Sequence, residues 1–322
     1  MRATRWTLGD AASAIASPDL HHMVGVAVGV PVVVVDLGPD ADANETDRVV
    51  AELTALPAVI VTTGDRRDER GDVHVDDPDP IVAATLANPL AAVTATQVLR
   101  GSEGRTLAEG LLVESLAYAT LQSGPEHRAW QAGQGRRVRS DDAEPRIRIV
   151  DHGSHVEIVF TRPRLHNLID AAMRDQLVDA LKATAVGAPR SIRLGADGPT
   201  FCGGGDPAEF GTVADPATGH AVRSTAGIAP WLSLVAERVT AEIRGACVGA
   251  GVELIAFCGR VEATEDARFQ LPEVAMGLLP GTGGTISVPA RIGRQRTLEW
   301  LLTANEIDAV TALEWGVVDQ IV

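Results

Sequence analysis

Two glutamates lie twenty residues apart, each beside a segment rich in turn-forming residues. Glu253 follows a glycine cluster in residues 245–254 (GACVGAGVEL) and falls in the first turn of an expected apolar helix. The helix dipole favours a carboxylate there. Glu273 follows Pro272 in residues 269–285 (FQLPEVAMGLLPGTGGT). Taken singly, each acid is equally well explained as an ordinary structural residue.

A third segment, residues 201–210 (FCGGGDPAEF), contains three consecutive glycines that let the backbone turn sharply and approach a ligand closely. The order strand, glycine loop, helix recurs in this part of the chain, and it places backbone amides where they can bind an anion or an oxyanion. Two carboxylates beside such amides could orient a water molecule, accept its proton and deliver another. If both lie close together, the pKa of one should rise.

Together these segments resemble the enoyl-CoA hydratase/isomerase (crotonase) family in order, spacing and composition. Residues 162–168 (RPRLHNL) resemble a further family segment, and residues 292–293, 301–303 and 312–318 resemble its closing pattern. The resemblance covers residues 146–322, about half of the chain. It implies an α/β fold with a crotonase-like spiral core of repeated ββα units, and the apolar patterns of the first half predict a smaller α/β N-terminal domain joined to it.

The resemblance also implies roles for individual residues. Glu253 and Glu273 would be the catalytic acids, and the amides of Gly203 and Ala250 would form the oxyanion hole. The family usually has glycine at the position of Ala250, but alanine keeps the N–H if its φ stays negative. The residues expected to bind substrate are Arg162, Gly204, Asp206 and Gly281.

Many members of the superfamily lack one or both of these acids. The presence of both in this chain favours hydration of a 2-enoyl-CoA to a 3-hydroxyacyl-CoA. The alternatives are an enoyl-CoA isomerase or C–C hydrolase of the same superfamily, or a non-catalytic acyl-CoA-binding subunit. Coenzyme A would enter as part of the substrate, and no cofactor or metal is expected. The resemblance suggests a homotrimer or hexamer, and residues 211–231 are predicted to line the acyl pocket.

The composition restricts the remaining possibilities. A formal net charge of −15 argues against nucleic-acid binding, which needs clustered Lys and Arg. The densest basic stretch, residues 133–139, is interpreted as a solvated linker end. Three cysteines without a CxxC pair suit no disulfide framework, so a reducing cytoplasm is the simplest setting. No signal peptide is predicted, and the apolar run 24–35 is too short to span a bilayer.

A polar, acidic stretch at residues 140–145 predicts a boundary between domains at 1–140 and 146–322. The first domain should contain a parallel β-α-β unit, a loop and a helical segment at 81–130. Its expected elements are strands 31–37 and 58–63, helix 45–56, loop 65–80, and helices 81–100 and 106–122. The second domain should contain a hairpin of strands 146–150 and 155–160, helix 167–183, and strands 191–194 and 239–243.

Residues 88–130 resemble the helical tail that family members carry after their closing pattern. The N-terminal half therefore resembles a degenerate crotonase unit that lacks its own glycine loop and acid pair. We expect it to be catalytically silent, with the helices of residues 88–130 covering the C-terminal core. The alternative is an unrelated small α/β domain joined by a linker.

Overall fold

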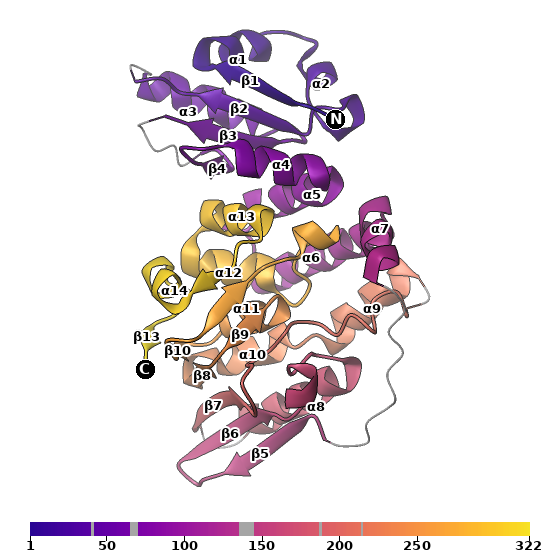
Figure 1. Ribbon diagram of the computed structural model, residues 1–322, viewed down its shortest axis with the longest axis vertical. Coiled ribbons are helices and arrows are strands. Elements are labelled where there is room, and N and C mark those ends of the chain that lie inside the picture. The colour runs from indigo at the N-terminus through magenta and orange to yellow at the C-terminus, as the bar shows by residue number, and fades with distance from the viewer. Residues whose placement is uncertain (40–41, 65–69, 135–144, 187–188, 214) are drawn as a thin grey trace.

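The computed structural model describes residues 1–39, 42–64, 70–134, 145–186, 189–213 and 215–322. Helices and three β-sheets form a mixed α/β structure. Helices α5 and α6 lie between the N-terminal sheet and the six-stranded sheet of the C-terminal half (Figure 1). The predicted α/β class is therefore confirmed. The predicted boundary at residues 140–145 and most of the basic stretch 133–139 lie outside the described residues.

The N-terminal sheet is wholly parallel, in the order β1-β2-β3-β4. The side chains of strand β2 point alternately into two different cores, because successive side chains of a strand lie on opposite faces of its sheet. Val33 and Val35 pack with the helices of one face, whereas Val32 and Val34 face a core shared with the C-terminal half. The strands and the two longer helices of the outer face are β1 (Ala3–Thr7), β2 (Val32–Asp36), β3 (Val59–Thr63), β4 (Val73–His74), α1 (Leu8–Ile15) and α3 (Ala43–Leu53).

The predicted β-α-β unit is confirmed, because β2 and β3 pair in parallel. Strand β1 was missed, and β4 lies inside the predicted loop 65–80. Two short elements complete this region, α2 (Leu20–Met23) and η1 (Val26–Val28). The sheet contains no antiparallel hairpin, so its likeness to a degenerate crotonase unit stays a prediction.

The helical segment consists of α4 (Asp79–Ala87), α5 (Pro89–Arg100), α6 (Leu107–Gln122) and α7 (Pro125–Gln134). The single helix predicted at 81–100 is wrong, because Pro89 cannot continue the hydrogen-bond ladder of α4. Helices α4 and α5 instead meet at 112°. Thr106 and Glu109 form a capping box that starts α6. Among the described residues, no single helix is long and apolar enough to cross a membrane. The bent pair α4 and α5 would be long and apolar enough only if the two helices are taken together.

The C-terminal half begins with the predicted antiparallel hairpin, which leads into parallel strands in the order β13-β10-β8-β7-β6-β5. A second sheet has the order β12-β11-β9. The strands of the large sheet are β5 (Ile147–Asp151), β6 (His155–Phe160), β7 (Ser191–Ala196), β8 (Val239–Ile243), β10 (Arg260–Ala263) and β13 (Gln320–Ile321). Those of the small sheet are β9 (Ala246–Val248), β11 (Arg268–Gln270) and β12 (Ile307–Asp308).

The helix predicted at 167–183 starts later than expected, at α8 (Ala171–Ala185). His166 and Asn167 have positive φ angles of 52° and 51°, which end any helical path before Asp170 caps α8. Asn167 is buried and its amide donates to the carbonyl oxygens of Asp197 and Thr200. The other helices and turns are α9 (Pro216–Ala226), α10 (Ala229–Val235), α11 (Ala250–Ile255), α12 (Gly284–Ile292), α13 (Arg294–Thr303), α14 (Ala309–Trp315), η2 (Pro163–Leu165), η3 (Ala236–Arg238) and η4 (Val274–Met276).

The helical segment joins the two halves through a common core. Valines of β2 and β3 belong to the same buried cluster as residues of α5, α12 and α13. Arg100 at the end of α5 forms an ion pair with the buried carboxylate of Asp72, 2.6 Å away, and so ties α5 to the N-terminal sheet. On the C-terminal side, a Cβ added to Gly110 of α6 would lie 2.5 Å from Ile286 of α12. The predicted packing of residues 88–130 on the C-terminal core is therefore observed.

Candidate active site

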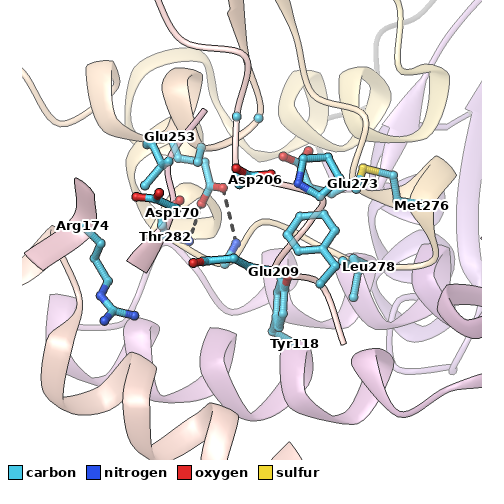
Figure 2. A pocket seen from close by; sticks show the side chains of 18 of the residues that line it. Tyr118, Asp170, Arg174, Asp206, Glu209, Glu253, Glu273, Met276, Leu278 and Thr282 are labelled. Carbon is cyan, nitrogen blue, oxygen red and sulfur yellow. Dashed lines mark hydrogen bonds between the residues drawn. The ribbon is translucent and has the colours of Figure 1, made fainter. Parts of the chain in front are cut away.

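A cavity of about 350 Å³ opens where α6 and α7 meet the glycine loops of the C-terminal half. Figure 2 shows Glu253 and Glu273 on opposite sides of it, with the Tyr118 ring entering from below. Seven of the eight site residues predicted from sequence line this one cavity. They are Gly203, Gly204, Asp206, Ala250, Glu253, Glu273 and Gly281.

Glu253 lies in the short helix α11, which begins directly after Gly249. Its side chain is buried, and the carboxylate accepts hydrogen bonds from three backbone amides. Oε2 accepts from Thr282 N at 2.7 Å and Gly284 N at 2.8 Å, and Oε1 accepts more weakly from Gly281 N at 3.4 Å. Burial raises the pKa of Glu253, whereas the amides oppose this shift by stabilising the ionised form.

Glu273 has a different environment from Glu253. It is also buried, but its Oε2 accepts no hydrogen bond from any residue that the structure describes. Burial, and secondly the charge of Glu253, raise the pKa of Glu273 well above its usual range. Its Oε1 would lie 2.7 Å from a Cβ at position 249, where φ is +52°, so only glycine fits there. Glu273 is therefore the acid that more readily keeps its proton.

The oxyanion prediction needs a correction at Gly203. The Gly203 N–H donates to the His166 carbonyl oxygen at 2.8 Å, so it is not available to a ligand. The next amide, Gly204 N–H, points to Cys202 Sγ at 3.4 Å. By contrast, the amides of Gly205 and Ala250 donate to no acceptor among the described residues, and both residues line the cavity. The glycine motif located the loop, but not which of its amides is free.

The two loops that carry these amides meet at Gly204. Its φ of +94° favours glycine, and a Cβ there would lie 3.2 Å from the Val248 carbonyl oxygen. The same Cβ would lie 4.0 Å from Ala250 N, so the glycine loop and the start of α11 lie against each other. Gly205 and Ala250 thus form the candidate pair of free donors. The role predicted for Ala250 stays a prediction.

Direct substrate contact by Arg162 was predicted wrongly. The side chain is 6% exposed and does not line the cavity. Its guanidinium donates to the Leu168 carbonyl oxygen and forms ion pairs with Asp170 at 3.2 Å and Asp206 at 3.7 Å. Arg162 therefore stabilises the glycine loop through Asp206, from outside the cavity lining. Asp206 lines the cavity, but it is also buried and paired with Arg162.

A third carboxylate, which the sequence analysis missed, comes from the N-terminal half. Glu114 of α6 is 2% exposed. It accepts hydrogen bonds from Gly283 N at 2.7 Å, Thr285 N at 2.9 Å and Thr285 Oγ1 at 2.7 Å. Burial, and then the charge of Glu253, raise the pKa of Glu114 from 4.5 to about 8. A charged residue on the apolar stripe of Leu111 and Tyr118 was the signal that could have revealed it.

Residues 281–285 thus divide their amides between two carboxylates. Those of Gly281, Thr282 and Gly284 face Glu253, and those of Gly283 and Thr285 face Glu114. The Tyr118 ring fixes the start of the loop, because a Cβ on Gly281 would lie 2.6 Å from it. Among the described residues, no three or more His, Cys, Asp or Glu side chains are grouped to hold a metal ion.

Comparison with known proteins identifies the family. The sequence model for enoyl-CoA hydratase/isomerase matches residues 152–322, more than half of the chain. The chain therefore belongs to the enoyl-CoA hydratase/isomerase family. The predicted crotonase resemblance is confirmed at this level.

Individual relatives agree with this assignment. Enoyl-CoA isomerase/hydratase fer4 of Mycosarcoma maydis is 27% identical over 174 residues, which are 51% of this chain and 64% of that protein. The chain thus spans less than two thirds of that relative's length. An enoyl-CoA hydratase subunit I of Geobacillus kaustophilus is 31% identical with a TM-score of 0.51, over 55% of this chain and 68% of that one. Enoyl-CoA hydratase of Bacillus anthracis is 30% identical with a TM-score of 0.50, over 55% and 70%.

The raised pKa of Glu114 predicts how stability depends on pH. A carboxyl whose pKa is higher in the folded state stabilises fully below its unfolded pKa, and this contribution is lost as pH rises through the folded value. Between about pH 4.5 and 8, the Glu114→Gln variant should therefore lose less unfolding free energy than the wild type. Urea unfolding at a series of pH values measures this difference.

The matched control is Glu306→Gln, which makes the same chemical change at an exposed position. Its pH dependence should run parallel to that of the wild type. If the Glu114→Gln curve also runs parallel to the wild type, burial does not raise the pKa of Glu114 as described.

Proposed function

We propose that this protein adds water to a 2-enoyl-CoA to give a 3-hydroxyacyl-CoA. The observation that carries the proposal is the unequal pair of glutamates in one cavity. Glu253 has three amide donors that stabilise its ionised form, whereas Glu273 has an unpartnered oxygen and a more strongly raised pKa. A base and an acid can therefore coexist in the same site near neutral pH.

The proposed reaction assigns each group one task. Ionised Glu253 accepts a proton from a water molecule whose oxygen bonds to C3 of the enoyl group. The electrons of the double bond move towards the thioester oxygen, where the amides of Gly205 and Ala250 stabilise the developing negative charge. Protonated Glu273 then delivers its proton to C2. The proton gained by Glu253 balances the one lost by Glu273, and exchange with solvent restores both.

The second candidate is an enoyl-CoA isomerase, which moves a proton between two carbons of the acyl chain. The unpartnered Oε2 of Glu273 favours it, because one free carboxylate oxygen is enough for such a shuttle. In that case Glu253 would act mainly through its hydrogen bonds to residues 281–284. Replacing each acid separately distinguishes the two reactions.

For a hydratase, Glu253→Gln and Glu273→Gln should each lower kcat by about 10²–10⁴-fold, because each removes a proton-transfer group. Loss of the enoyl absorbance of crotonyl-CoA and of longer and branched 2-enoyl-CoA substrates measures the rate. Glu265→Gln, at an exposed position outside the cavity lining, is the matched control. A strong loss in Glu273→Gln but a loss under about tenfold in Glu253→Gln would support the isomerase instead.

The oxyanion donors are tested by Ala250→Pro, which deletes the amide N–H. Position 250 is the first residue of α11, where proline suits the helix backbone. The variant should fold but lose about 10²–10³-fold in kcat. Ala250→Ser keeps the N–H and should lose far less. Equal losses in the two variants, with unchanged melting temperatures, would remove this amide from the mechanism.

A further inference from the structure

A second cavity, of about 300 Å³, adjoins the candidate active site. The two cavities share part of their walls, namely Arg174, Arg223, Ile228, Gly281 and Thr282. Beyond this shared wall, the second cavity is lined mainly by small and apolar residues such as Leu111, Leu112 and Pro230. Most of the lining would suit a hydrocarbon chain, so the arginines in the shared wall need a separate explanation.

Arg223 of α9 is a half-buried cation whose partners are all neutral. Its guanidinium lies over the Tyr118 ring, 4.4 Å from the centroid. Nε donates to Ser115 Oγ at 3.2 Å, and Nη2 donates to the Ser115 carbonyl oxygen at 3.3 Å. In the part of the chain that the structure describes, Arg223 has no ion pair with a carboxylate. Burying a cation without a counter-charge is unfavourable, and burial lowers the pKa of Arg223.

The charge of Glu114 partly opposes the effect of burial on the pKa of Arg223, but among the described residues no nearby carboxylate forms an ion pair with it. Glu114 and Glu253 direct their oxygens to the amides of residues 281–285. With a pKa of about 8, Glu114 is mostly protonated at neutral pH. An anion that enters the cavities would therefore find Arg223 available.

Gln122 adds a second polar group without a partner at the same place. Its Oε1 is buried and makes no hydrogen bond among the described residues. A Cβ on Gly219 would lie 3.3 Å from this atom and 3.5 Å from Nη1 of Arg223, so both groups meet at one side of the cavity. Rotating the amide would present its NH2 group to an anion beside the guanidinium.

We propose that the acyl group of the substrate carries a carboxylate at its distal end, and that Arg223 binds it. The substrate class would be CoA thioesters of dicarboxylic acids, with the chain carbons against the apolar lining. This inference rests on the proposed acyl-CoA function and names the substrate of that site. It assigns Arg223 a role beyond anchoring α9 to α6.

Calorimetric titration with saturated ligands tests the proposal without turnover. The probes are dicarboxylic acyl-CoAs of increasing chain length (glutaryl, adipyl and pimelyl), each compared with the monocarboxylic acyl-CoA of equal length. At its best length, the wild type should bind the dicarboxylic ligand at least about tenfold more tightly, as expected for a charge-assisted hydrogen bond. Arg223→Gln should abolish this preference, and its affinity for the monocarboxylic ligand reports whether the site is still folded.

Two further variants separate recognition from structure. Arg223→Lys keeps a point charge and should retain part of the preference. Arg174→Gln removes the other arginine of the shared wall, whose charge is already paired with Asp175 at 2.7 Å, and should retain the preference. If Arg223→Gln retains the preference, or if matched ligands bind the wild type equally at every length, the proposal is overturned.

The titration also separates this proposal from the hydratase reaction. A clear dicarboxylic preference without hydration of the corresponding enoyl-CoAs supports the acyl-end assignment and contradicts the proposed reaction. Hydration of monocarboxylic enoyl-CoAs with no dicarboxylic preference supports the proposed reaction and contradicts the acyl-end assignment. Absence of binding to either ligand series overturns both.

Discussion

The structure of the site depends on how residues 281–285 distribute their backbone N–H groups. Glu253 accepts hydrogen bonds from some of these amides and Glu114 from the others. Both carboxylates are almost wholly buried. Removing either carboxylate would leave buried backbone N–H groups without an acceptor, which typically costs about 1–3 kcal/mol for each group. Because Glu114 belongs to α6, a helix of the N-terminal half is part of the wall that holds Glu253 in place.

The same division of hydrogen bonds sets the charges in the cavity. Glu253 receives amides that stabilise its ionised form, whereas Glu273 receives none at its Oε2 from the described residues. Burial and mutual repulsion then raise the pKa of Glu273 and Glu114, so fewer negative charges remain at neutral pH than there are acids. Arg223 consequently keeps a positive charge that no carboxylate of the described chain pairs with, beside an otherwise apolar lining.

Sequence alone located the parts of the site whose signal is local. Glu253 and Glu273 follow turn-rich segments with characteristic spacing, and the structure places both in one cavity. The sequence analysis assigned the free amide to Gly203, whereas the structure shows it at Gly205, because amide direction depends on backbone angles such as the φ of +94° at Gly204. Arg162 and Glu114 were misjudged or missed because their partners lie elsewhere in the fold. Strand β1 was missed because its identity depends on long-range pairing with β2.

The interaction on which the site depends is the support that α6 of the N-terminal half gives to the loop that orients Glu253. Hydrogen–deuterium exchange of residues 281–285, compared between the wild type and Glu114→Ala, tests it most directly. We expect faster exchange at Gly283 and Thr285, which lose their acceptor, and then at Thr282 and Gly284 as the loop loosens. Unchanged exchange at all four amides in a folded variant would contradict it.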